Sequence, residues 1–136
     1  MVNSEDLESY FIRMGLEASE VDENMWVLEG EDEHEARVVA TFAPPVVLLR
    51  IKVMDVPDGA TDEQLAPLFR KLLELNASDL VHGSYGIEEG DVALSDALEL
   101  ETLDFQELRA SYESIVFAAS SHMKDLVELV PVAHKG

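Results

Sequence analysis

The sequence has no cysteine and only nine lysine and arginine residues against 29 aspartate and glutamate residues, so its formal net charge is -20. The absence of cysteine excludes disulfides, thiolate zinc sites and thiol nucleophiles. The shortage of basic residues argues against a nucleic-acid partner, because phosphate binding requires clustered lysine and arginine. No apolar run is long enough to span a bilayer, and the N-terminus lacks the pattern of a signal peptide. We therefore expect a cytoplasmic protein that contacts neither nucleic acid nor a membrane.

The apolar content is sufficient for one folded domain. Hydrophobic residues make up 47% and charged residues 28% of the 136 positions, a balance typical of a globular protein rather than a disordered chain. No internal repeat or linker is visible. We predict a single domain over residues 1–130 and a flexible C-terminal tail over residues 131–136, because Pro131 ends the last helical pattern.

The first third of the sequence predicts a helix followed by a hairpin. Asn3 or Ser4 can cap a short amphipathic helix. An acidic stretch follows, and two strands are then expected over residues 25–28 and 35–42, joined by a turn over residues 30–33.

The next predicted strand indicates that the sheet has two unlike faces. It covers residues 46–56 and follows Pro44 and Pro45, which lack the backbone N–H groups that an interior ladder needs. One face carries Val47, Leu49, Ile51 and Val53, whereas the other carries Val46, Leu48, Arg50, Lys52 and Met54. A wholly apolar face opposite a mixed one predicts an antiparallel sheet that helices cover on one side and leave partly open on the other.

The second half of the chain adds two helices and two strands. Thr61 begins a capping box for a helix that we expect to end near Asn76. Strands are expected over residues 80–85 and 92–100, and Asp104 caps a long final helix. The predicted order is α-β-β-β-α-β-β-α, an α+β domain with a single antiparallel sheet.

The sequence carries no recognisable motif for catalysis or metal binding. The segment HGSYG at residues 82–86 lacks the spacing of a nucleophile elbow, which also needs a strand that runs directly into a helix. The four histidines show no metal-ligand pairing, and the acidic runs at residues 22–26 and 31–35 lack the ligand pattern of an EF-hand loop. We expect no cofactor, no metal and no enzymatic activity; a carboxylate-based or metal-assisted enzyme is the alternative from another functional class.

A surplus of apolar residues indicates an interaction surface. The helix after Thr61 has more leucine and phenylalanine than one buried face needs, and Phe117 lies off the main stripe of the last helix. The large negative charge keeps such a protein soluble. Self-association is the simplest explanation, and a dimer that leaves Val46 and Leu48 accessible would also suit an extended guest segment.

Several segments match the pattern of a known family. They are Trp26 in the first predicted strand, the apolar residues 46–56, residues 72–77 near the end of the second helix, residues 85–87 and the long terminal helix. With the size, the acidity and the order of elements, these segments resemble the class I type III secretion chaperones and the related YbjN-type domain. The resemblance spans nearly the whole chain.

The resemblance implies a non-enzymatic, chaperone-like module that holds an extended segment of a partner protein on a homodimer. By this analogy the dimer-interface candidates are Leu65, Phe69, Leu72 and Leu73, and the partner-binding candidates are Trp26, Val46 and Leu48. The alternative is a YbjN-like regulatory or adaptor domain that docks on a folded partner without unfolding it.

Overall fold

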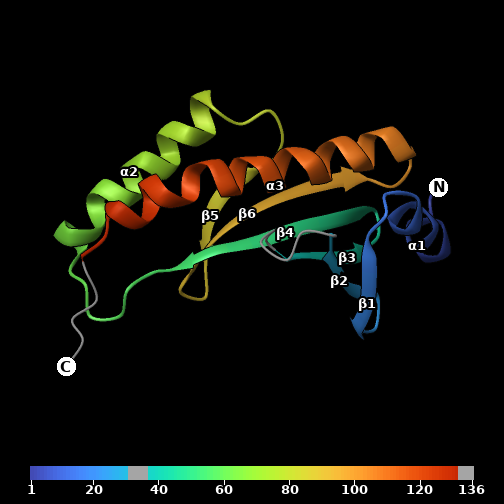
Figure 1. The fold of residues 1–136 in the computed structure, drawn as a ribbon, viewed down its shortest axis with the longest axis horizontal. Helices are drawn as coiled ribbons and strands as arrows, with labels where there is room; N and C mark the ends of the chain where they lie inside the picture. The colour runs from blue at the N-terminus through green and yellow to red at the C-terminus, as the bar shows by residue number, and fades with distance from the viewer. Residues whose placement is uncertain (31–36, 132–136) are drawn as a thin grey trace.

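The computed structural model describes residues 1–30 and 37–131, and within them three helices and six strands (Figure 1). The elements in chain order are α1 (Ser4–Arg13), β1 (Glu17–Asp22), β2 (Met25–Glu29), β3 (Val38–Ala43), β4 (Val46–Asp55), α2 (Asp62–Ser78), β5 (Ser84–Glu88), β6 (Asp91–Glu99) and α3 (Phe105–Glu128). The predicted tail beyond Pro131 and most of the predicted turn at residues 30–33 lie outside the described residues.

All six strands form one antiparallel sheet in the order β1-β2-β3-β4-β6-β5. The predicted fold class, an α+β domain with a single antiparallel sheet, is confirmed. Pro44 and Pro45 form the turn between β3 and β4, as their missing N–H groups require.

The sheet contains one strand more than the sequence analysis predicted. The additional strand is β1, whose residues belong to the acidic stretch and are almost all exposed. It has no alternation of apolar and polar residues, so the usual signal for a strand is missing. Its backbone is held instead by pairing with β2, across a tight turn in which Asn24 adopts a positive φ of 61°.

The predicted helix starts are confirmed, but one helix end and one strand are displaced. Capping boxes begin α1 at Asn3 and α2 at Thr61, and the Asp104 side chain accepts a hydrogen bond from the Glu107 N–H at the start of α3. The end expected near Asn76 is wrong, because α2 continues to Ser78. The strand expected over residues 80–85 begins only at residue 84, and the apolar residues before it lie in a loop.

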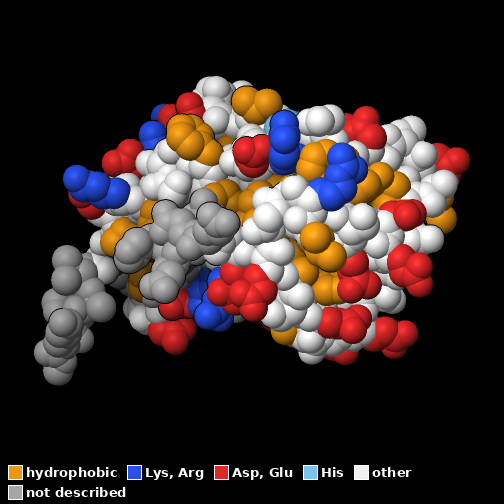
Figure 2. Space-filling view, turned by 45° about the vertical axis from the view of Figure 1, so that its right-hand side comes forward, with side chains coloured by type: hydrophobic (Ala, Val, Ile, Leu, Met, Phe, Trp, Pro, Cys, Tyr) orange, Lys and Arg blue, Asp and Glu red, His pale blue; other side chains and the backbone are white. Residues whose placement is uncertain are grey.

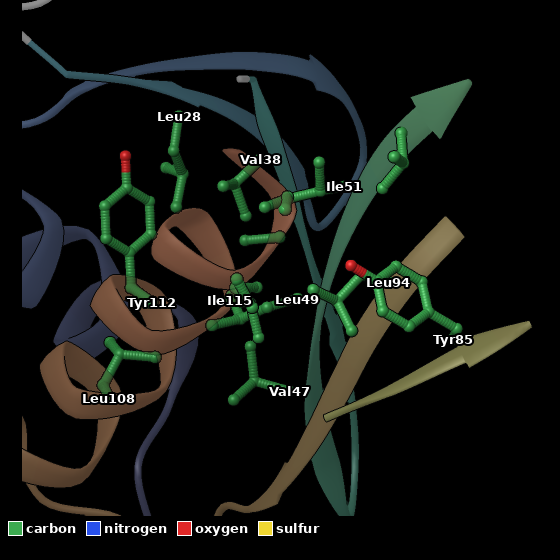
Figure 3. Packing of buried hydrophobic residues seen from close by; sticks show 14 of the residues in the cluster. Leu28, Val38, Val47, Leu49, Ile51, Tyr85, Leu94, Leu108, Tyr112 and Ile115 are labelled. Carbon is green, nitrogen blue, oxygen red and sulfur yellow. The ribbon is translucent and has the colours of Figure 1, made fainter. Parts of the chain in front are cut away.

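The helices all pack on one side of the sheet, which we call the covered face. It includes Val47, Leu49 and Ile51 of β4, which are completely buried. Figure 3 shows Leu108 and Ile115 of α3 pointing toward these side chains, and Figure 1 shows α2 and α3 on the same side of the sheet. The opposite side, which carries Val46, Leu48 and the residues in register with them, we call the open face.

Candidate partner-binding surface

The open face presents a strip of half-buried aliphatic side chains. Its centre is the cross-strand row of Met25, Thr41, Leu48 and Ala97, with Val27 and Val39 of the next row beside it; on β4 that next row continues to Arg50, where the charged end of the face begins. Directly opposite residues on one face of a sheet lie about 5 Å apart, so these rows form a continuous surface. Val46 extends the strip at the start of β4, where it is paired with Ala43 and Glu99. The predicted partner-binding residues Val46 and Leu48 therefore belong to one surface.

The other end of the open face is charged. Arg50 Nε lies 3.2 Å from Glu88 Oε2, and Lys52 Nζ lies 2.7 Å from Asp55 Oδ1 and 3.5 Å from Asp91 Oδ1. The hydrogen bond and the negative charge of Asp55 raise the pKa of Lys52, and Lys52 lowers the pKa of Asp55 in the same way. The basic groups here are thus matched by carboxylates, and the aliphatic strip is the part of this face without charge pairing.

Trp26 does not belong to this surface. Its side chain is only 2% exposed and lies on the covered face, where its ring meets Phe11 of α1 edge-on at a centroid distance of 5.7 Å. A guest segment cannot reach the ring without displacing α1. The side chain is in the core because its strand position alternates with the half-buried neighbours Met25 and Val27.

The four dimer-interface candidates on α2 divide into two pairs. Leu65 and Leu72 are 7% and 4% exposed and contribute to the buried side of the helix. Leu73 is 69% exposed, and Phe69 is half-buried. Only the second pair is available to another molecule, because an amphipathic helix that packs on a sheet buries one stripe and exposes the other.

Further apolar side chains are exposed on α3 and in the loop before β5. Phe117 is 73% exposed on the outer side of α3, and Val81 is 87% exposed. In Figure 2, small hydrophobic patches lie among many acidic side chains and a smaller number of basic ones. Such exposed apolar groups in a strongly acidic surface fit a protein that binds others while staying in solution.

A hydrogen-bonded network, which the sequence analysis did not foresee, joins α2, β5 and α3. The Asn76 amide group donates to the Tyr85 carbonyl oxygen at 3.1 Å, and its Oδ1 accepts from the Tyr85 N–H at 2.7 Å. Tyr85 Oη lies 2.7 Å from His122 Nδ1, and His122 Nε2 lies 2.5 Å from Asp79 Oδ2. Burial and the neighbouring Asp79 carboxylate raise the pKa of Tyr85. The network therefore fixes the end of α2 against the sheet and α3.

The described part of the chain offers no constellation for metal binding or nucleophilic catalysis. It contains no group of three or more His, Cys, Asp or Glu residues placed to hold a metal ion. Buried Ser111 donates a hydrogen bond to Asp96 Oδ2 at 2.6 Å, and His82 Nδ1 lies 3.7 Å from the same oxygen. A serine triad needs histidine between serine and carboxylate, whereas here the carboxylate lies between the other two.

No helix in the parts of the chain that the structure describes has the length and apolar character needed to cross a membrane.

Comparison with known proteins identifies a protein family for this chain. Residues 2–131 match the CesT_Tir_1 family model. No curated protein sequence matches the chain.

Solved structures with a similar fold include a chain from a type III secretion system complex and a YbjN protein. A chain of the heterodimeric ExoU–SpcU complex from the type III secretion system of Pseudomonas aeruginosa has a TM-score of 0.67 and 16% identity, covering 91% of this chain and 97% of that one. A chain of the ExsC–ExsE complex has a TM-score of 0.62 and 19% identity, covering 98% and 100%. YbjN from E. coli has a TM-score of 0.64 and 13% identity, covering 89% and 91%. At these identities the similarity shows a shared fold.

Proposed function

Because the chain belongs to the CesT_Tir_1 family of type III secretion chaperones, we propose that it is a cytoplasmic, non-enzymatic, chaperone-like module that holds an extended segment of a partner protein. The observation that carries this proposal is the aliphatic strip on the open face, around Val46 and Leu48. Two of the similar folds were solved as protein–protein complexes, and one of those complexes comes from a type III secretion system.

The geometry of the strip suits an extended guest. Val46 and Leu48 project from the same side of β4, about 7 Å apart along the strand. An extended segment presents every second side chain to one side with the same repeat, so two of its apolar residues can contact both positions. The guest buries aliphatic surface without breaking the ion pairs of Arg50 and Lys52, which lie farther along β4.

We also propose that two copies associate through the outer side of α2, with Phe69 and Leu73 at the contact. Both side chains are accessible, so a second copy can remove their exposed apolar surface from water. Light scattering should give twice the mass of the 15.1 kDa chain. The variant Leu73→Glu should give the single-chain mass, whereas Val81→Glu, a charge at another exposed apolar position, should remain dimeric. A wild-type chain that is monomeric at all concentrations would refute the dimer.

The client-binding proposal is tested with Leu48→Glu and the matched control Val81→Glu. Proteins captured from the native cell extract by the wild type and by Val81→Glu, but not by Leu48→Glu, are the candidate clients. Each candidate is then purified and exposed to limited proteolysis with and without the chain. We expect one segment of the client to be cut when alone and protected in the complex with wild type or Val81→Glu.

The same experiment separates the chaperone from the adaptor. A partner that resists the protease by itself, and whose cleavage pattern the chain leaves unchanged, is a folded partner and supports the YbjN-like alternative. Equal capture by Leu48→Glu and the wild type would exclude the open face as the binding surface.

A further inference from the structure

A hollow of about 460 Å3 lies between the end of α1 and the first turns of α3, away from the open face. It is lined by Arg13, Met14, Arg109, Tyr112 and Glu113. Two of its five lining residues are arginines, in a chain with only nine basic residues among 136. This concentration of positive charge is what requires an explanation.

One aromatic ring holds both arginines in place. The Arg13 guanidinium carbon lies 3.9 Å from the centroid of the Phe105 ring, and that of Arg109 lies 5.8 Å from it. The Phe105 ring is itself fixed by edge-on packing against Tyr10 at 5.8 Å. Cation–π contacts at these distances orient a guanidinium group without neutralising it, so its N–H donors remain available.

The positive charge in this hollow is only partly matched. Arg109 Nε lies 3.3 Å from Glu113 Oε1, whereas Arg13 has no carboxylate oxygen within 4.0 Å among the residues that the structure describes. Each of the other described arginines, Arg37, Arg50 and Arg70, lies near a carboxylate. Acidic residues outnumber basic ones by about three to one. An arginine that packs on an aromatic ring without a neighbouring carboxylate is therefore unexpected.

We propose that the hollow is a binding site for one oxyanion, a carboxylate or phosphate group, held by the guanidinium groups of Arg13 and Arg109. Both arginines line this hollow, and an oxyanion bound there can accept charge-assisted hydrogen bonds from guanidinium groups, which match the geometry of carboxylate and phosphate. Elsewhere the net charge of -20 repels anions. The site is independent of the chaperone-like function and does not require it.

The test titrates the purified wild-type chain with inorganic phosphate and, separately, with glutarate, and follows the melting temperature against sodium chloride of equal ionic strength. A bound anion raises the melting temperature in a saturable way. We expect saturation with at least one anion. The anion that binds more tightly shows whether the site prefers a phosphate or a carboxylate group. Arg13→Gln should weaken the apparent affinity about tenfold, since it removes a charge-assisted interaction.

Two further variants make the result specific. Lys124→Gln removes a single exposed charge farther along α3 and should leave the anion affinity unchanged. Glu113→Gln removes the carboxylate that competes for Arg109 and should increase the affinity. A melting temperature that responds to neither anion beyond the chloride control would overturn the proposal. So would equal responses in the wild type, Arg13→Gln and Glu113→Gln.

Discussion

The covered and open faces of the sheet are formed by alternate residues of the same strands, but they differ in what surrounds them. In β4, Val47, Leu49 and Ile51 are completely buried under the helices, whereas Val46 and Leu48 are half-buried and reach solvent. Both sets are aliphatic, so hydrophobicity alone does not distinguish them. The difference shows that the helices of this chain cover only one of the two apolar surfaces of β4.

The distribution of charge explains why the helices cover only one face. On β4 the charged residues Arg50 and Lys52 both belong to the open face, where they form ion pairs with Glu88, Asp55 and Asp91. Covering these pairs with a helix would remove them from water at a cost that their attraction does not reliably repay. The covered face of β4 has no such group. A partner that contacts only the aliphatic end of the open face avoids this cost.

The sharpest test of the comparison replaces neighbouring leucines on opposite faces. Leu49→Ala should lower the free energy of unfolding by about 2–5 kcal/mol, because it leaves a cavity under α3. Leu48→Ala should cost about 1 kcal/mol or less, because its side chain is already partly in water. Urea unfolding of both variants at several protein concentrations measures the difference. Equal costs would break the distinction between the faces, and a cost for Leu48→Ala that grows with concentration would show that another copy covers the open face.

A second test compares a glycine under the helices with one in an open loop. Gly83 and Gly59 both have positive φ, 81° and 78°, so alanine is strained at either position. At Gly83 a Cβ would also lie 2.7 Å from the Ser95 carbonyl oxygen and 3.2 Å from Ile115 of α3, whereas at Gly59 it meets no atom within 4 Å. We expect Gly83→Ala to cost about 2–3 kcal/mol and Gly59→Ala about 1 kcal/mol in thermal or urea unfolding. Equal costs would mean that the backbone at Gly83 is not held closely against β6 and α3.

The sequence predicts those parts of the fold that depend on local patterns. The alternation in β4, the capping boxes at Asn3 and Thr61, and the break at Pro44 each contain their own signal, and each is confirmed. Strand β1 depends on pairing with β2 rather than on its own acidic residues, so no local pattern indicates it. The positive-φ turn at Asn24 is the only signal that could have suggested a hairpin there.

The candidate surface is predictable to a smaller extent. Periodicity places Val46 and Leu48 on the mixed face, and the structure confirms that position. Partner binding there stays a prediction. Trp26 was assigned from family analogy, and periodicity within β2 does not tell which of its faces the helices cover. The hydrogen bonds between Asn76 and Tyr85 could not be predicted either. The sequence indicated only that α2 would end near Asn76, whereas the Asn76 side chain binds the backbone of β5, a separate element.

The smallest expected effect concerns Tyr85, on the covered side, and depends on pH. Its pKa is raised above the ordinary value of 10.0, chiefly by burial. In the unfolded chain the Tyr85 phenol loses its proton near pH 10. In the folded chain the phenol is still protonated at that pH. The stabilising contribution of the neutral phenol is therefore fully present below about pH 10 and is lost progressively as the pH rises toward the folded-state pKa.

Tyr85→Phe should cost about 1 kcal/mol near neutral pH, because it removes the hydrogen bond to His122 Nδ1. It should also make the unfolding free energy fall less steeply between about pH 8 and about pH 10.5 than in the wild type, since the substituted ring has no proton to lose. Urea unfolding at the two pH values gives both quantities. An unchanged slope would mean that the phenol ionises equally easily in the folded and unfolded chains. The ring would then be in contact with water, and the end of α2 would not close the covered face as the structure shows.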